Sequence, residues 1–254
     1  MVIDVHAHLW MGHVEQNKAE ILAAMERYGI SKVFVSGLGA HVPTPDEVMQ
    51  QNRAVYDFTR EEPDRIYGYV YVSPEHSNAV NVLRHGVEDM GMKGMKLWVS
   101  TFCDVPEVNP LAERCIEYGI PVLIHAFVKA TGQYPNESTA LHVAHLARRY
   151  PELKIIMAHL GGNSYDAIPQ IAKYQNVWVD DSGSIYQADE LPYTLAALGA
   201  GRVLHGTDMP GTYLGSYGQA LAIEDPEART RILWKNAMQL FDTNFKIGEP
   251  YHDY

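Results

Sequence analysis

The sequence predicts an α/β fold, a single (β/α)8 TIM barrel spanning residues 1–254. Eight short β-rich runs alternate with helical stretches along the chain. These runs are almost continuously apolar, as is typical of strands buried on both faces. Polar residues follow the first, fourth, fifth, sixth and eighth runs, and barrel enzymes carry their chemistry at that end of the strands. An open, doubly wound sheet also fits the alternation, but no Gly-x-Gly-x-x-Gly motif follows the first run.

The first four strands are expected at 2–8, 31–36, 65–72 and 92–99. A helix at 14–27 should end at Gly29, because glycine readily adopts the left-handed conformation that terminates helices. The next helix should begin at Thr44, which can cap it. Pro45 suits the first helical position, and Glu47 can complete a capping box. A third helix is expected at 77–90.

The second half of the chain repeats this alternation. A helix starting at Asn109 and Pro110 should end near Gly119, and the fifth strand follows it, rich in the Val, Leu and Ile that favour strands. We read 211–218 as a loop after the last strand, without a recognisable motif. The remaining strands are expected at 121–127, 153–159, 176–180 and 202–205, and the remaining helices at 138–149, 165–174, 191–198 and 227–241.

Composition limits the partners. The chain has 31 acidic and 20 basic residues and a net charge of −11, which argues against nucleic acid, and no basic run suggests a membrane surface. No apolar run reaches the roughly 20 residues needed to span a bilayer. Cys103 and Cys115 form no Cys-x-x-Cys pair, and no secretory signal is recognisable. We therefore expect a cytoplasmic protein with free thiols and a small-molecule substrate; a homo-oligomer is suggested by analogy with other barrel enzymes.

Four histidines and one aspartate form the candidate site. His6 and His8 are two residues apart in a strand, so both side chains should point into the barrel. His125 and His159 are the first polar residues after buried runs, and Asp208 follows the eighth run. Taken singly, a histidine could be a satisfied core residue and Asp208 could cap a helix. Together, they predict a metal centre at the barrel mouth.

This pattern resembles the amidohydrolase superfamily over residues 1–242, and in particular the branch that includes aminocarboxymuconate-semialdehyde decarboxylase. The pattern is specific for the superfamily but does not indicate which substrate the protein uses. The supporting segments are Ile3-Asp4-Val5-His6-Ala7-His8, Gly94-Met95-Lys96-Leu97, Ala158-His159-Leu160-Gly161-Gly162, Gly206-Thr207-Asp208-Met209-Pro210 and Asn236-Ala237-Met238-Gln239-Leu240-Phe241.

The resemblance implies a role for each residue. His6, His8, His125 and Asp208 match the ligands of single-metal members, and His159 matches an acid/base beside the ion. In two-metal members, such as phosphotriesterase, the residue matching His159 binds a second ion, and a carboxylated lysine bridges the two ions. Lys96 stands at that lysine's position and could instead anchor substrate or pack in the barrel. The resemblance therefore allows either one or two metal ions per chain.

The ligand types favour Zn²⁺, although Mn²⁺ and Fe²⁺ also accept them. The main expectation is a hydrolase that attacks an amide, ester or lactone with metal-activated water, with Asp208 and His159 as catalytic residues. A non-oxidative decarboxylase or a hydratase would use the same ligands, and a barrel that binds without catalysing is a further alternative.

Residues near the site receive weaker predictions. Trp10 and Trp98 could line a substrate pocket or simply pack. Asp180 or Asp181 could orient a ligand through a hydrogen bond, although exposure is an equal alternative. We expect His205 to pack. His41 could line the substrate mouth, but a solvated loop is the favoured interpretation; His142 and His145 are assigned to the outer helical ring.

Overall fold

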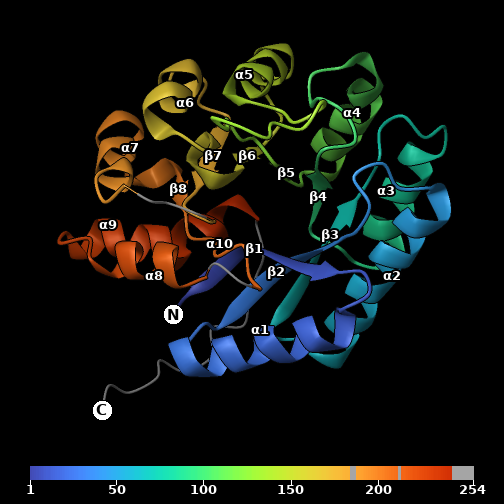
Figure 1. Cartoon of the computed structure of the whole chain (residues 1–254), viewed down its shortest axis with the longest axis horizontal. Coiled ribbons are helices and arrows are strands. Elements are labelled where there is room, and N and C mark those ends of the chain that lie inside the picture. Colours follow the sequence, from blue (N-terminus) through green and yellow to red (C-terminus); the bar gives the residue numbers. More distant parts are fainter. Residues whose placement is uncertain (184–186, 211–212, 242–254) are drawn as a thin grey trace.

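The computed structural model describes residues 1–183, 187–210 and 213–241 and confirms the (β/α)8 barrel, with a ring of helices around the strands (Figure 1). The parallel sheet has the strand order β1-β2-β3-β4-β5-β6-β7-β8. Beyond β8, the backbone amide of Val5 donates to His205 O over 2.9 Å and that of His8 donates to Met209 O over 2.8 Å, which joins the last segment to the first. The strands are β1 (Ile3–Trp10), β2 (Lys32–Leu38), β3 (Ile66–Tyr71), β4 (Gly94–Leu97), β5 (Val122–Ile124), β6 (Ile155–Met157), β7 (Val177–Asp180) and β8 (Val203–Leu204).

The helices begin and end largely where local sequence signals place them. Thr44 and Glu47 form the expected capping box, and Gly29 ends the first helix with a φ of 65°. The described helices are α1 (Val14–Tyr28), α2 (Pro45–Glu61), α3 (Ala79–Glu88), α4 (Asn109–Tyr118), α5 (Ala140–Arg149), α6 (Ser164–Ile171), α7 (Glu190–Leu198), α8 (Tyr213–Leu221), α9 (Pro226–Thr230) and α10 (Asn236–Leu240). None of them combines the length and apolar character that crossing a membrane would require.

One expectation for the last part of the chain is wrong, and the helix expected at 227–241 is present with an irregularity. Most of the segment read as a loop at 211–218 belongs to α8; residues 211–212 lie outside the described residues. The final helix is not uniform, because a π-helical turn at Arg231–Lys235 separates α9 from α10. Within this turn Ile232 O accepts a hydrogen bond from the backbone amide of His205 over 3.1 Å. The turn therefore ties the final helix to the end of β8.

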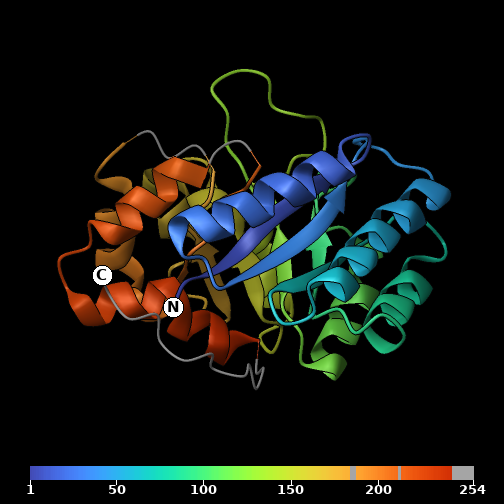
Figure 2. The same cartoon turned by 90° about the horizontal axis from the view of Figure 1, so that it is seen from below.

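Two apolar cores hold the barrel together. The larger one lies between the strands and the surrounding helices, and the smaller one fills the barrel interior. At the amino ends of the strands, Phe241 stacks on Phe34 with ring centroids 4.0 Å apart. Figure 2 shows α10 at this end of the barrel, opposite the long loop that follows β5. The interior is thus closed at the amino ends of the strands, and the candidate ligands lie at the carboxyl ends.

A bulge changes the phase of β1 before the two histidines. Asp4 pairs with Val33 and Ala7 pairs with Val35, so β1 contains one residue more than β2 between these pairs. Ile3 and Val5 belong to the interior core before the bulge, whereas Ala7 and Leu9 pack in the outer core after it. The extra residue therefore turns His6 and His8 toward the barrel interior.

Candidate metal centre

Three predicted ligands converge at the mouth of the barrel. His6 Nε2 lies 3.0 Å from His8 Nε2, and Asp208 Oδ1 lies 3.0 Å from His8 Nε2 and 3.7 Å from His6 Nε2. Metal–ligand bonds of about 2.1 Å place ligand atoms roughly 3.0–3.4 Å apart. Two imidazole nitrogens and a carboxylate oxygen at these separations fit a divalent ion. Both histidines are buried, while the Asp208 side chain is 27% exposed and faces the opening.

Hydrogen bonds on the far side of each imidazole keep Nε2 directed at this centre. Asp180 Oδ2 lies 2.9 Å from His6 Nδ1, and Ser36 Oγ lies 2.8 Å from His8 Nδ1. Burial lowers the pKa of His6 to about 3, so the ring is neutral at physiological pH and Nε2 keeps its lone pair. Such outer hydrogen bonds are typical of metal-binding histidines.

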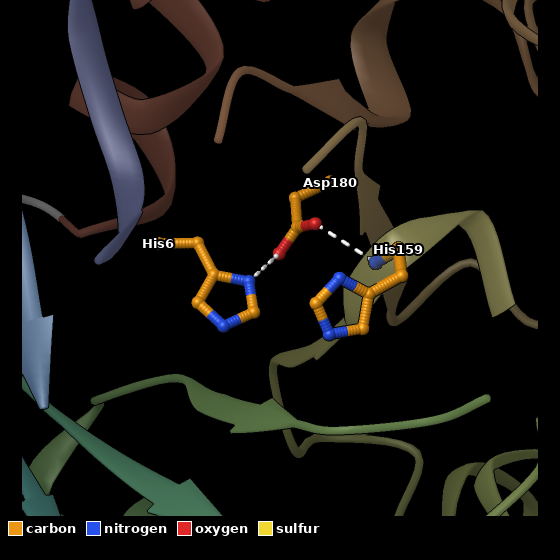
Figure 3. Close-up of side chains that lie close together, drawn as sticks. All are labelled: His6, His159 and Asp180. Carbon is orange, nitrogen blue, oxygen red and sulfur yellow. Dashed lines mark hydrogen bonds and ion pairs between the residues drawn. The ribbon is translucent and has the colours of Figure 1, made fainter. Parts of the chain in front are cut away.

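Asp180 connects His6 to His159 (Figure 3). Its Oδ1 accepts a hydrogen bond from the backbone amide of His159 over 2.9 Å, while Oδ2 contacts His6. His6, His159 and Asp180 thus form a second cluster of potential ligands, but the carboxylate is already engaged on both oxygens. Asp180 is fully buried, so the expectation that its side chain is exposed is wrong. The other alternative, a hydrogen bond that orients a histidine, describes its contact with His6.

His125 lies next to this centre and contacts it through His159. His125 Nδ1 is 3.1 Å from His159 Nε2, and His125 Nε2 is 2.7 Å from Glu137 Oε1. Among the described residues, neither cluster of close ligand atoms includes His125. Its role as a ligand therefore remains a prediction.

Lys96 is completely buried beside the ligands. Its Nζ lies 3.0 Å from His6 Nε2. Burial lowers the pKa of Lys96 to about 8, while Asp208 and Asp180 oppose this shift. The structure thus places the lysine where the sequence suggested, and its carboxylation stays a prediction.

The backbone at the centre adopts unusual conformations. His159 and Asp208 each have a φ of 61°, in the left-handed region that costs a non-glycine residue about 1–3 kcal/mol. Gly206 packs so closely that a Cβ there would lie 2.9 Å from the Cβ of His6. The glycine in the Gly206-Thr207-Asp208 segment therefore makes room for the imidazole.

Aromatic rings form a wall above the ligands. Trp10 lies 5.8 Å from the His8 ring and 5.6 Å from the Trp98 ring. His41 is exposed yet packs 5.0 Å from Trp98 and 4.3 Å from Tyr134. His41 is therefore exposed, as expected, and also packs against the aromatic wall. Contact of Trp10 and Trp98 with substrate remains a prediction.

A buried ion pair lies behind the site. His205 Nδ1 is 3.1 Å from Asp181 Oδ1, and both side chains are fully buried. Burial favours neutral His205, but Asp181 outweighs it and raises the pKa of the imidazole. His205 packs as expected, whereas exposure of Asp181 is wrong. On the outer ring, His145 pairs with Asp104 over 2.8 Å, away from the centre.

Sequence reasoning missed three residues that contact the histidines: Ser36, Glu137 and Ser182. Each is a single polar residue outside any recognisable motif. Only the position of Ser36 near the end of β2, and of Glu137 and Ser182 after β5 and β7, could have suggested a role.

Comparisons with known proteins agree with this architecture. A family model described as Amidohydrolase matches residues 3–243. A search of curated proteins gave no match. The described fold is similar to 2,6-dihydroxybenzoate decarboxylase from Rhizobium, with a TM-score of 0.75, 17% identity and coverage of 95% of this chain and 98% of that one.

Two further solved structures are comparably similar. For 5-carboxyvanillate decarboxylase from Sphingomonas paucimobilis the TM-score is 0.75 and the identity 16%, with 95% of this chain and 98% of that one covered. For a dihydroxybenzoic acid decarboxylase from Polaromonas sp. JS666, which has manganese and 2-nitroresorcinol bound, the TM-score is 0.76 and the identity 17%, with 95% and 96% covered.

These comparisons correct our main functional expectation. We expected a hydrolase of amides, esters or lactones, but the similar solved structures include decarboxylases of benzoates and a vanillate. The expectation was wrong because the same histidine and aspartate ligands serve both reactions, so the ligand pattern could not separate them. The decarboxylase alternative is better supported.

Proposed function

This chain belongs to the amidohydrolase family, and on that premise we propose that it is a metal-dependent, non-oxidative decarboxylase of a small aromatic carboxylate. The observation that carries the proposal is the convergence of His6, His8 and Asp208 beneath an aromatic wall and beside a buried lysine. Decarboxylases of aromatic acids share the fold.

We assign His6, His8 and Asp208 as ligands of one divalent ion, with His125 as a fourth. The ion supplies positive charge that attracts an anionic substrate and stabilises negative charge on its oxygens. Mn²⁺ and Zn²⁺ are the two candidates, since manganese is bound in the Polaromonas enzyme and both ions accept nitrogen and oxygen ligands. Lys96 acts as an unmodified lysine whose ammonium group attracts the substrate carboxylate, while Trp10 and Trp98 pack against the ring.

Decarboxylation requires a proton donor. The bond between the substrate carbon and its carboxylate breaks, the electron pair stays on the carbon, CO₂ leaves, and a proton takes its place. We propose His159 as the residue that holds this proton. Asp208, the partly exposed carboxylate at the mouth, can carry the proton from His159 to the substrate carbon.

Each nitrogen of His159 faces a group that can accept a hydrogen bond. Glu137 can only accept, so His125 Nε2 donates to it; in the metal-free protein His125 Nδ1 then accepts from His159 Nε2, a contact that it would exchange for the ion. Ser182 Oγ lies 2.5 Å from Asp180 Oδ1, so its hydroxyl donates to that carboxylate. Ser182 Oγ, 2.9 Å from His159 Nδ1, then accepts a proton from it.

The experiment measures CO₂ release and metal content together. Protein loaded with Mn²⁺ or Zn²⁺ is incubated with a panel of hydroxylated benzoates. We expect His159→Asn to keep the metal and lose at least about 100-fold in kcat, since general acid catalysis contributes about 10²–10⁴. Asp208→Asn should lose both metal and activity. His145→Asn, on the outer ring, is the matched control and should change neither.

Three results would reject the proposal. Metal-loaded, folded protein that releases no CO₂ from the panel, or product that has gained water while keeping its carboxylate, excludes a decarboxylase; the second result indicates a hydratase. Purified protein that binds neither ion would instead support a barrel without catalysis.

A further inference from the structure

Glu137 is a buried carboxylate in an otherwise exposed loop. The loop joins β5 to α5 and stands out from the carboxyl end of the barrel (Figure 2). Residues 130–135 are exposed, whereas Glu137 is only 1% exposed. A carboxylate buried to this degree needs several hydrogen-bond partners to compensate for lost hydration.

Glu137 accepts hydrogen bonds from both the site and its own loop. Oε1 lies 2.7 Å from His125 Nε2 and 2.7 Å from Lys129 Nζ. Oε2 lies 2.8 Å from Gln133 Nε2 and 3.1 Å from the backbone nitrogen of Tyr134. One carboxylate thus holds three loop residues and one histidine of the proposed site.

These contacts determine which nitrogen of His125 is free. An ionised carboxylate has no proton to donate, so the bond to Glu137 requires a proton on His125 Nε2. In the neutral ring Nδ1 then keeps its lone pair, which points toward His159. Asp180 acts on His6 in the opposite sense, since it holds Nδ1 and leaves Nε2 free.

The same loop reaches the aromatic wall. Lys129 Nζ lies 3.8 Å from the centre of the Tyr134 ring, and Tyr134 packs on His41, which packs on Trp98. Displacement of this loop would therefore disturb the wall and remove the partner of His125 Nε2 together.

We infer that Glu137 is a positioning residue that holds His125 with Nδ1 directed toward the site and ties this orientation to the observed position of the β5–α5 loop. Its consequence for catalysis rests on the proposed function, whereas the protonation pattern of His125 does not. Glu137→Gln keeps the shape but replaces one accepting oxygen with a donating amide, which must face at least one N–H group. Lys129→Met removes a loop contact and leaves the bond between Glu137 and His125 in place.

The test is ¹⁵N NMR of the histidine rings in Zn²⁺-loaded protein, which needs no substrate. Wild-type and Lys129→Met proteins should show His125 with its proton on Nε2 alone, and Glu137→Gln should lose this single form. Zn²⁺ affinity or kcat should fall about 10–100-fold in Glu137→Gln, as when other outer partners of metal-binding histidines are removed. Lys129→Met should change KM alone.

Each contrary outcome overturns the inference. A proton on Nδ1 of His125 in the wild type refutes it even if no variant folds. A folded Glu137→Gln protein could keep its Zn²⁺ affinity and kcat, or change only in KM as Lys129→Met does. Either result would show that Glu137 only anchors the loop. A correct tautomer with no decarboxylation of any substrate would reject the proposed function and leave the positioning role intact.

Discussion

The protonation of His125 predicts how the stability of the metal-free protein depends on pH. Burial lowers the pKa of this imidazole from 6.5 to about 4, with Glu137 opposing the shift. Between these values the unfolded chain binds the proton and the folded chain does not. The free energy of unfolding must therefore fall as the pH falls below 6.5. At about 1.36 kcal/mol per pH unit, His125 alone removes roughly 2 kcal/mol between about pH 7.5 and pH 5.0.

His125→Gln isolates this contribution. Its amide can still donate to Glu137, which also keeps its bond to Lys129 and stays ionised. Both proteins are stripped of metal with a chelator, and urea unfolding is measured at the two pH values. Burial raises the pKa of Asp4 to about 6, which acts in the opposite direction, but this effect is common to both proteins and cancels in the comparison. The wild type should lose about 2 kcal/mol more than the variant. An equal loss in both would show that His125 is not held neutral by burial.

Three further predictions follow from other contacts. Asp180→Asn should weaken metal binding about 10–100-fold, measured by titration of the metal-free protein, because His6 loses its accepting carboxylate; unchanged affinity would contradict this role. Phe34→Ala should lower the free energy of urea unfolding by about 3–5 kcal/mol, since the ring is fully buried against Phe241, and a loss below about 1 kcal/mol would show that the contact is dispensable. Trp10→Leu should raise KM for an aromatic acid without altering metal content; an unchanged KM would place Trp10 outside the substrate pocket.

The barrel could be predicted from sequence because its signals are local. Alternating apolar runs and helices, the capping box at Thr44 and Glu47, and Gly29 all act within a few residues, and the structure confirms them. Features that depend on distant partners could not be predicted. The π-helical turn at Arg231–Lys235 meets the backbone of His205, which lies far away in sequence.

The same distinction applies to the site. His6 and His8 share a face by strand geometry, and the ends of parallel strands bring Asp208 to them. The burial of Asp180 depends on contacts with His6 and His159 from other strands, and the contact between Glu137 and His125 depends on how the β5–α5 loop folds back. The reaction was the hardest to predict, because substrate and proton path determine it while the ligands do not.

The bulge in β1 separates the residues that fill the barrel floor, Ile3 and Val5, from the two histidines at the mouth, so substitutions in one part need not affect the other. Substitutions at Ile3 or Val5 alter the floor of the barrel without redirecting the imidazoles further along. Deletion of Val5 would remove the extra residue and leave Ile3, His6 and His8 in regular alternation on the interior face of the strand. A strand of unchanged length that paired without the bulge would instead bring Ala7 and Leu9 inward and turn both imidazoles away from the barrel mouth.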